Sequence, residues 1–195
     1  MEIYLIRHTA PQVPEGVCYG RSDLPLRESF ADEWARLKVK LPESFDCVYT
    51  SPLRRCRQLA ELLLTNGNGL KVDGRLLEVD FGEWEMKRWD EIDPETLQKW
   101  TDNFVEKGPP GGESFRGVAR RVESFWKDLA GLSFSGVAVV SHAGFIRTAV
   151  AQVIGLPLRE SFNLHFDFGG VSLIETAHPR LGRGRERGKL RYLNL

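Results

Sequence analysis

The sequence predicts an α/β protein of three layers, a three-layer α/β/α sandwich in which helices cover both faces of a mostly parallel sheet. Short apolar segments typical of buried strands alternate with longer segments whose apolar residues recur at helical spacing. The C-terminal part breaks this alternation, because residues 163–168 and 171–176 are typical of strands around Gly169-Gly170, and residues 190–194 of a last strand. We therefore expect antiparallel strands at one edge of the sheet.

The first strands and helices are predicted within residues 2–65. Residues 2–6 form a continuous apolar strand, and residues 28–41 carry apolar side chains three or four positions apart, as a helix does. A second strand over residues 46–50 precedes a helix over residues 53–65, which a run of Asn and Gly residues ends. This order of strand and helix is typical of parallel sheets.

The middle of the chain predicts a small helical insertion. Residues 70–84 combine short extended pieces with turns, and residues 94–106 begin with proline, which is favoured at the first position of a helix. A loop rich in glycine and proline follows at residues 108–112. Because long excursions of this kind commonly carry function, we expect the insertion, about residues 80–112, to cover the site as a lid.

The last strand–helix unit follows the insertion. Residues 114–130 predict an amphipathic helix, residues 136–141 a buried strand, and residues 145–154 a helix that a glycine and a proline end. Glu113 is expected to be structural, as a cap of the helix that starts near Ser114.

Composition limits the classes of function. A chain of 195 residues, 42% hydrophobic and 28% charged, is typical of one globular domain, here residues 1–195. The 27 basic and 27 acidic residues cancel, so nothing overall predicts a nucleic-acid or membrane partner. No apolar run reaches the ~18 residues of a membrane span, and the first residues do not resemble a signal peptide.

Three further features concern location, the surface and metal binding. Three cysteines without CxxC spacing predict reduced thiols in a cytoplasmic protein, rather than a disulfide framework or a zinc site: Cys18, Cys47 and Cys56. The basic segment 183–189 predicts a solvated loop rather than a nucleic-acid surface. His165 and His178 lack metal-ligand spacing and predict structural or solvent-facing roles.

Two histidines follow two predicted strands in the same way. Arg7 and His8 come after strand 2–6, and His142 comes after strand 136–141. The carboxyl ends of parallel strands meet at the edge where open α/β sheets bind ligands, so we expect one site to contain both histidines. Histidine can carry a covalent intermediate as a nucleophile. Taken singly, His8 could instead be a core histidine and His142 a helix cap.

Arginines after the second strand predict an anion site. Arg54, Arg55 and Arg57 lie at the start of helix 53–65, where guanidinium groups and free N–H groups can face one ligand. Their spacing turns them in different directions, so at least one is expected to face solvent. A phosphomonoester carries a charge of about −1.5 to −2 near pH 7, which requires more than one arginine.

Phosphoryl transfer to a histidine also requires a proton donor for the leaving alkoxide. Glu78 lies among apolar neighbours, which favour the protonated form of a carboxyl group. Three other acids compete for the role, and the residues alone do not choose among the four: Asp80, Glu83 and Glu85.

Five short motifs occur in one order along the chain: IRHT, TSPLRRCRQLAE, LLEVDFGEWE, PPGGESF and VVSHAGFIR. This ordered set resembles the histidine phosphatase superfamily, in its branch of phosphoglycerate-mutase-like phosphatases. The resemblance runs from residue 2 to about residue 150 and therefore covers most of the chain.

The resemblance implies a phosphoric monoester hydrolase that works through phosphohistidine, with no metal and no cofactor. The resemblance implies that His8 is the phosphorylated nucleophile and that Glu78 is the proton donor. It also implies that His142 contacts the phosphate as a second histidine and that two arginines bind the phosphate. Its S-x-L-x-R pattern selects Arg55 over Arg54 and Arg57. The catalytic set that it implies is Arg7, His8, Arg55, Glu78 and His142.

Within this family, residues 16–26, GVCYGRSDLPL, most resemble the alpha-ribazole phosphatases, which remove the 5′-phosphate from alpha-ribazole 5′-phosphate in cobalamin synthesis. This implies a small phosphorylated metabolite as the substrate. We expect Thr9, Tyr19 and Arg21 to contact it beside the phosphate ligands.

Some positions depart from the family's pattern. Residues 9–11 are Thr-Ala-Pro instead of Gly-Glu-Thr, Pro14 replaces an asparagine, Leu59 a threonine and Met86 a glycine. The implied catalytic set is complete, so these departures bear on the substrate rather than on activity. Three alternatives stay open: a phosphatase of another small sugar or nucleotide phosphate, a phosphoglycerate mutase, and a non-catalytic module that only binds a phosphorylated ligand. The sequence predicts no oligomeric state.

Overall fold

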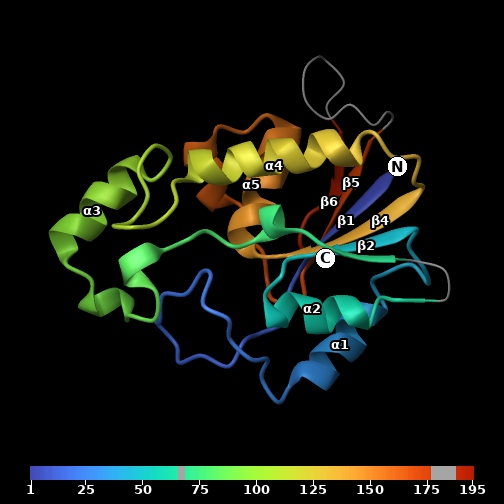
Figure 1. Cartoon of the computed structure of the whole chain (residues 1–195), viewed down its shortest axis with the longest axis horizontal. Helices are drawn as coiled ribbons and strands as arrows, with labels where there is room; N and C mark the ends of the chain where they lie inside the picture. The colour runs from blue at the N-terminus through green and yellow to red at the C-terminus, as the bar shows by residue number, and fades with distance from the viewer. Residues whose placement is uncertain (66–68, 177–187) are drawn as a thin grey trace.

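In the computed structural model, which describes residues 1–65, 69–176 and 188–195, one mixed sheet forms the centre of the molecule (Figure 1). The described strands form a six-stranded sheet in the order β3-β2-β4-β1-β5-β6. Their bounds are Glu2–Arg7 for β1, Cys47–Thr50 for β2, Gly69–Val72 for β3, Gly136–Ser141 for β4, Val171–Glu175 for β5 and Lys189–Tyr192 for β6.

The parallel strands align their carboxyl ends at one edge of the sheet. β1 pairs with β4 so that Arg7 lies opposite Ser141, and β2 pairs with β4 so that Thr50 lies opposite Val140. β5 and β6 are antiparallel additions beside β1, as the sequence predicted. The register therefore brings the residues that follow β1, β2 and β4 close together.

The prediction of a strand over residues 163–168 is wrong. A 3-10 helix, Leu158–Asn163, is followed by an irregular segment. The alternation of apolar and polar residues suggested a strand, but Phe166 turns into the core, and the chain reverses where the Gly170 N–H donates to the Asp167 carbonyl at 3.0 Å. Gly169 takes a φ of 67°, a conformation that glycine adopts easily.

Helices cover both faces of the sheet, so the fold has the three layers that the sequence predicted (Figure 1). Along β1, Ile3 and Leu5 belong to one core cluster and Tyr4 and Ile6 to the other, because successive side chains of a strand point to opposite faces. The first cluster contains residues of α4, Phe115–Leu129, and α5, Ala143–Ile154. The second contains residues of α1, Phe30–Lys38, and α2, Arg54–Glu61.

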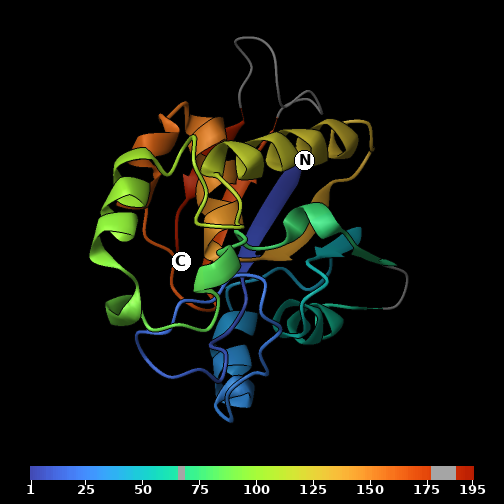
Figure 2. The same cartoon turned by 60° about the vertical axis from the view of Figure 1, so that its left-hand side comes forward.

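Residues 80–112, which precede α4, form a lobe at one side of the sheet. It contains α3, Pro94–Asn103, which lies beside the sheet rather than in either helical layer (Figures 1 and 2). Asp93 caps α3 by accepting the Thr96 N–H. Pro94 occupies the first turn, as the sequence predicted. The lobe also contains two 3-10 helices, Gly82–Trp84 and Trp89–Glu91, whereas a third, Gly74–Leu76, packs in the main core beside α4.

Aromatic side chains hold this lobe together. The rings of Trp84 and Trp100 meet edge to face with centroids 5.6 Å apart, and Phe81 contacts Trp89 at 5.7 Å. Trp100 also contacts Phe104, which continues the aromatic contacts toward α4. Such pairs stabilise the lobe beyond the burial of apolar area and connect it to the main body.

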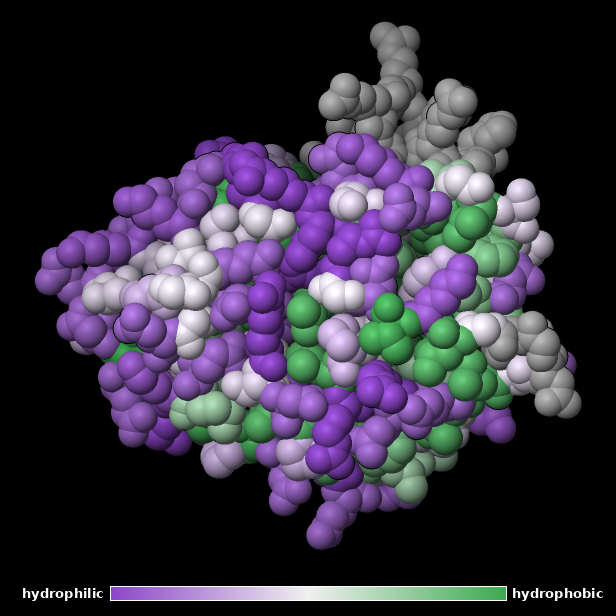
Figure 3. Space-filling view, in the orientation of Figure 1, coloured by the Kyte–Doolittle hydropathy of each residue, from purple (hydrophilic) through white to green (hydrophobic). Residues whose placement is uncertain are grey.

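On the face shown in Figure 3, most side chains are hydrophilic, and hydrophobic ones gather over the end of the sheet that carries β2 and β3. Leu62, Leu64 and Val72 are among the exposed hydrophobic residues of this part of the chain. No helix in the described residues is long and apolar enough to cross a membrane. Residues 183–187 of the basic segment and His178 lie outside the described residues.

Candidate active site

The strand ends bring the two histidines together. His8 follows β1 and His142 follows β4. The backbone N–H of His8 donates to the backbone carbonyl of Ser141 at 3.0 Å. The two imidazole rings lie with centroids 5.0 Å apart, and both are almost completely buried. The arrangement matches the single site expected from their positions in the sequence.

The hydrogen bonds of His8 define which ring nitrogen is free to react. Nδ1 lies 2.7 Å from the carbonyl oxygen of Thr9, which can only accept, so Nδ1 carries the proton. Nε2 therefore holds the lone pair, and it accepts from Nε of Arg55 at 3.2 Å. Burial, then Arg55 and Arg7, lower the pKa of His8 well below its ordinary value of 6.5. The ring is thus neutral at pH 7, the form that acts as a nucleophile.

Only one of the three neighbouring arginines faces His8. Arg55 is 0% exposed, whereas Arg54 and Arg57 are exposed, and Arg57 lies 4.0 Å from Glu61 on the solvent side of α2. The Arg55 guanidinium donates to the carbonyls of Gly20 at 2.6 Å and Ser22 at 2.7 Å. These two bonds and the one to His8 hold the Arg55 guanidinium beside the His8 ring.

Glu85 holds the loop that supplies those carbonyls. Its carboxylate accepts the backbone N–H groups of residues 20–22 at 2.9–3.1 Å and of Phe81 at 3.2 Å, and also the Ser22 hydroxyl. These hydrogen bonds, against the cost of burial, lower the pKa of Glu85. Gly20 fits closely here, since a Cβ would lie 1.9 Å from the carbonyl oxygen of Val79. Glu85 thus supports Arg55 through the loop and does not reach His8.

Replacing Glu85 with glutamine should lower kcat/KM for p-nitrophenyl phosphate by about 10- to 150-fold, the range of one hydrogen bond to a charged group. The amide donates where the carboxylate accepted, so the loop and Arg55 shift. In an Arg55→Lys background the same change should cost much less, because the two residues act in one chain of contacts. Glu83→Gln, an exposed neighbour, is the control. Fully additive losses would contradict the coupling.

The side-chain carboxyl group of Glu78 lies against the first turn of α5. Its Oε1 accepts the N–H groups of Val79 and Gly144, both at 2.9 Å, and Oε2 lies 3.2 Å from the Gly144 nitrogen. Gly144 makes this approach possible, because a Cβ there would lie 2.3 Å from Oε1. The positive end of α5 and these donors hold the carboxyl group in place.

The other acids considered as proton donors are engaged elsewhere. Asp80 lies 3.2 Å from Arg21, Glu83 is exposed, and Glu85 holds the loop. The structure therefore places Glu78, of the four, beside His8 in the pocket described below.

Arg7 is held by the irregular segment that precedes β5. Its Nη1 donates to the Phe166 carbonyl at 2.6 Å, and its guanidinium stacks 3.8 Å from the centre of the Phe168 ring. The Phe168 ring also lies 5.6 Å from that of His8. Burial lowers the pKa of Arg7, and the neighbouring Tyr19 hydroxyl raises it in part. Arg7 lines the same pocket as His8.

His142 is buried behind His8. Its Nε2 lies 2.7 Å from the Ser51 hydroxyl and 3.4 Å from the Cys56 sulfur. Its side chain makes no capping hydrogen bond, although it occupies the N-cap position of α5, so the simple capping role is not what the structure shows. Burial and the charge of Arg55 lower its pKa well below 6.5.

Two buried neutral histidines predict a loss of stability in mild acid. Because folding lowers the pKa of His8 and of His142 below 6.5, the unfolded chain binds more protons than the folded chain below that pH. Their contribution is complete above about pH 6.5 and is lost as the pH falls; at pH 5.5 the free energy of unfolding should drop by about 1.4 kcal/mol for each histidine.

Urea unfolding at pH 7.5 and pH 5.5 measures this loss, and His142→Gln removes one of the two groups. The variant should lose about 1.4 kcal/mol less than the wild type between the two pH values. Equal losses in both proteins would show that His142 does not resist protonation in the folded state.

A pocket of about 210 Å³ lies beside these residues. Arg7, His8, Tyr19 and Glu78 line it, together with a cation that sequence reasoning missed, Arg147 of α5. Its remaining lining residues are mostly aromatic or small: Val17, Val79, Phe81, Trp89, Phe115, Ala143, Gly144 and Phe162. Phe81 and Trp89 come from the insertion, so this lobe forms one wall of the pocket.

The other residues expected to contact substrate take different places. Arg55 and His142 contact or adjoin His8 from the buried side, and Thr9 is 0% exposed and offers its carbonyl to His8. Arg21 points away to Asp80 and Glu113, both at 3.2 Å, and does not line the pocket.

Glu113 does not cap α4, contrary to the sequence prediction. Ser114 does so by accepting the Gly117 N–H, because its short hydroxyl side chain reaches the first turn. Glu113 instead pairs with Arg121 at 2.9 Å and with Arg21. Sequence reasoning did not assign a role in the site to Gly144 or Arg147. Their place within the VVSHAGFIR motif, which follows β4, was the one signal in the sequence that could have found them.

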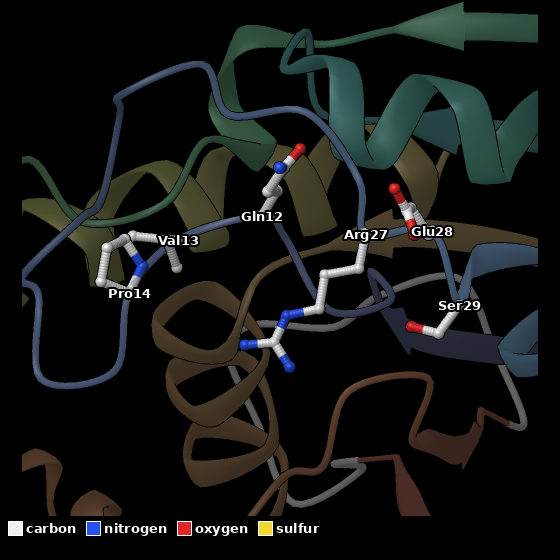
Figure 4. A pocket seen from close by; sticks show the side chains of 6 residues that line it. All are labelled: Gln12, Val13, Pro14, Arg27, Glu28 and Ser29. Atoms are coloured by element: carbon white, nitrogen blue, oxygen red, sulfur yellow. The ribbon is translucent and has the colours of Figure 1, made fainter.

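A larger hollow of about 620 Å³ lies elsewhere, between residues 12–14 and 27–29 (Figure 4). It contains Pro14, one of the departures from the family's pattern, and Arg27, whose Nε donates to the Pro11 carbonyl at 3.0 Å. None of its lining residues is a histidine, and Glu28 is its only carboxylate. Phosphoryl transfer needs a nucleophile and a proton donor, so we assign the active site to the smaller pocket, which contains His8 and Glu78.

The chain is similar to known proteins along most of its length. The sequence model of the histidine phosphatase superfamily (branch 1) matches residues 3–182. A relative from Escherichia coli, named adenosylcobalamin/alpha-ribazole phosphatase, is 30% identical over 90% of this chain and 90% of its own. A Hydrogenobacter thermophilus protein that bears the name "Putative phosphoserine phosphatase 2" is 31% identical over 98% of this chain and 94% of its own.

A solved structure shares the fold across the whole chain. The alpha-ribazole phosphatase from Shigella flexneri superposes with a TM-score of 0.86 at 28% sequence identity, covering 100% of this chain and 96% of that one.

Proposed function

The chain belongs to the histidine phosphatase superfamily, and we propose that it hydrolyses phosphomonoesters through a phosphohistidine on His8. We propose alpha-ribazole 5′-phosphate as its preferred substrate. The observation that supports the chemistry best is the neutral His8 ring, whose Nε2 lone pair lies beside Arg55 at the wall of a pocket that also contains Arg7 and Glu78.

In the first step the Nε2 lone pair of His8 attacks phosphorus, and the bond from phosphorus to the alcohol oxygen breaks. The leaving alkoxide takes a proton from Glu78. Arg7 and Arg55 neutralise charge on the phosphoryl oxygens, and Arg55, which donates to Nε2 in the free site, can turn this donor to a phosphoryl oxygen. The Thr9 carbonyl keeps the Nδ1 proton in place and supports the charge on the ring.

In the second step the Glu78 carboxylate takes a proton from water, and the oxygen of that water attacks phosphorus. The nitrogen–phosphorus bond breaks, which releases inorganic phosphate and returns His8 to its neutral form. Glu78 regains its proton and is ready to serve as a donor again. No step uses a metal, so EDTA should leave the rate unchanged.

The walls of the pocket support a nucleotide as the substrate. The rings of Tyr19, Phe81, Trp89 and Phe162 offer faces and edges to a flat base. A volume of about 210 Å³ is small beside the roughly 300–1,000 Å³ of pockets that enclose drug-sized ligands, so the phosphate and sugar would fill the pocket and the base would lie at its mouth.

A panel of phosphomonoesters tests this proposal by release of inorganic phosphate: alpha-ribazole 5′-phosphate, phosphoglycerates, sugar phosphates and nucleotides. The proposal expects the highest kcat/KM for alpha-ribazole 5′-phosphate. A tenfold higher value for another substrate would overturn the substrate assignment and leave the phosphatase chemistry in place.

The same panel separates the other classes of function. A phosphoglycerate mutase would interconvert phosphoglycerates and release little inorganic phosphate. A module that only binds phosphorylated ligands would hydrolyse no phosphomonoester, including p-nitrophenyl phosphate, although all five residues of the implied catalytic set are present.

A further inference from the structure

Arg121 of α4 is a cation that the proposed reaction does not use, and its side chain is only 13% exposed. Its Nε and Nη2 pair with the two carboxylate oxygens of Glu113 at 2.9 and 3.0 Å. Its Nη1 donates to the backbone carbonyls of Arg75 and Leu77, both at 2.6 Å, and its Nη2 to that of Glu78 at 3.2 Å. A guanidinium group has five N–H donors, so these five hydrogen bonds direct Arg121 to the protein itself rather than to a ligand.

The backbone that leads to the Glu78 side chain is held at four consecutive carbonyls. Arg121 holds three of them, and the Ser141 hydroxyl donates to the remaining one, the Leu76 carbonyl, at 2.8 Å. Ser141 is the last residue of β4 and directly precedes His142. The segment that carries Glu78 is therefore tied to α4 and to the strand end that carries His142.

The partner of Arg121, Glu113, connects this arrangement to the other side of the site. A Cβ at Gly117 would lie 2.9 Å from the Cγ atom of Glu113, so the glycine leaves room for this side chain. Glu113 also meets Arg21 at 3.2 Å, and Arg21 lies in the loop whose carbonyls hold Arg55. The ion pair thus joins the segment of the proposed proton donor to the loop that supports a phosphate ligand.

A proton donor works only within hydrogen-bond reach of the leaving oxygen, and a misplacement of about 1 Å can cost about 10²-fold in rate. Since the Glu78 side chain extends from the backbone that Arg121 holds, a shift of that backbone moves the carboxyl group. We propose that Arg121 is a positioning residue for the proton donor, because it fixes the backbone from which Glu78 reaches the leaving oxygen. This rests on the proposed function, in which Glu78 protonates the alkoxide.

The test measures how each protein depends on the leaving group. Benzyl phosphate releases an alkoxide that needs a proton, whereas p-nitrophenyl phosphate releases a phenolate that hardly does, and each carries one aromatic ring. The measured quantity is kcat/KM for p-nitrophenyl phosphate divided by kcat/KM for benzyl phosphate, which reports formation of the phosphoenzyme. Because both values come from one preparation, unfolded protein lowers them equally and leaves the ratio unchanged.

Arg121→Met should raise this ratio by about 10- to 100-fold, because a misplaced carboxyl group matters most where the proton is needed. Arg121→Lys keeps a charge beside Glu113 but lacks the planar fork that serves three carbonyls, so it should raise the ratio less. Glu78→Gln should itself raise the ratio by about 10²–10⁴-fold. In that background Arg121→Met should raise it little further, because both changes act through one carboxyl group.

Arg120→Met is the matched control, since Arg120 is the preceding residue of α4 and is exposed; its ratio should equal that of the wild type. A wild-type ratio in Arg121→Met, or in Arg121→Lys where the methionine variant does not fold, would overturn the positioning role. A full further rise in the Glu78→Gln background would overturn it as well. If Glu78→Gln itself leaves the ratio unchanged, or the wild type hydrolyses neither ester, the proposed function fails first and the positioning role with it.

Discussion

Replacing His8 with alanine should reduce turnover of every phosphomonoester by at least about 10⁴-fold, because the reaction loses its nucleophile and not merely a binding contact. The neighbouring Arg55 loses one acceptor but keeps its bonds to Gly20 and Ser22, so the fold should persist. Steady-state assays with p-nitrophenyl phosphate measure the loss, and circular dichroism and thermal unfolding check the fold.

His165→Ala is the matched control for this change. His165 is exposed and pairs with Asp167 at 2.8 Å, away from the pocket lining, so its loss should leave turnover within a few-fold of the wild type. If the His8 variant is folded and retains a rate near that of the wild type, His8 is not the nucleophile.

Glu78→Gln should separate substrates by the quality of their leaving group. A sugar alkoxide needs a proton to leave, whereas p-nitrophenolate hardly does, so formation of phosphoenzyme from p-nitrophenyl phosphate should be affected little. Hydrolysis of alpha-ribazole 5′-phosphate should fall by about 10²–10⁴-fold, the usual scale of general acid–base assistance. Phosphoenzyme should accumulate with the activated substrate, because the same carboxylate is needed to activate water.

Glu83→Gln makes the same substitution at an exposed neighbouring acid and should affect neither substrate. Small and equal losses on both substrates in Glu78→Gln would remove the proton donor role from Glu78. The same comparison applied to Asp80 and Glu85 would then show whether either residue carries it.

The layered fold could be predicted because it depends on periodic patterns. The apolar runs before His8 and His142 are buried on both faces, and helices α1 to α5 lie within four residues of their predicted bounds. The meeting of the two histidines followed from a rule of parallel sheets, since residues after neighbouring strands share an edge.

The irregular parts could not be predicted, because their conformation is set by distant contacts. Residues 163–168 alternate like a strand, yet their backbone bonds with Arg7 and turns at Gly169. Sequence reasoning also treated Glu85 as a possible acid, because nothing local shows that its carboxylate binds a loop more than sixty residues earlier. Arg147 was overlooked for a similar reason, since its place in the pocket depends on how α5 packs.

The central claim, that His8 carries the phosphoryl group, is tested most directly by locating that group in the protein. Glu78→Gln is mixed with p-nitrophenyl phosphate, quenched in alkali, which preserves phosphohistidine, and digested for mass spectrometry. We predict one phosphoryl group on His8, lost on brief treatment with acid and absent from the His8→Ala protein. A phosphoryl group on another side chain, such as Ser51 or Cys56 beside His142, or none at all while p-nitrophenol is released in a burst, would contradict the account.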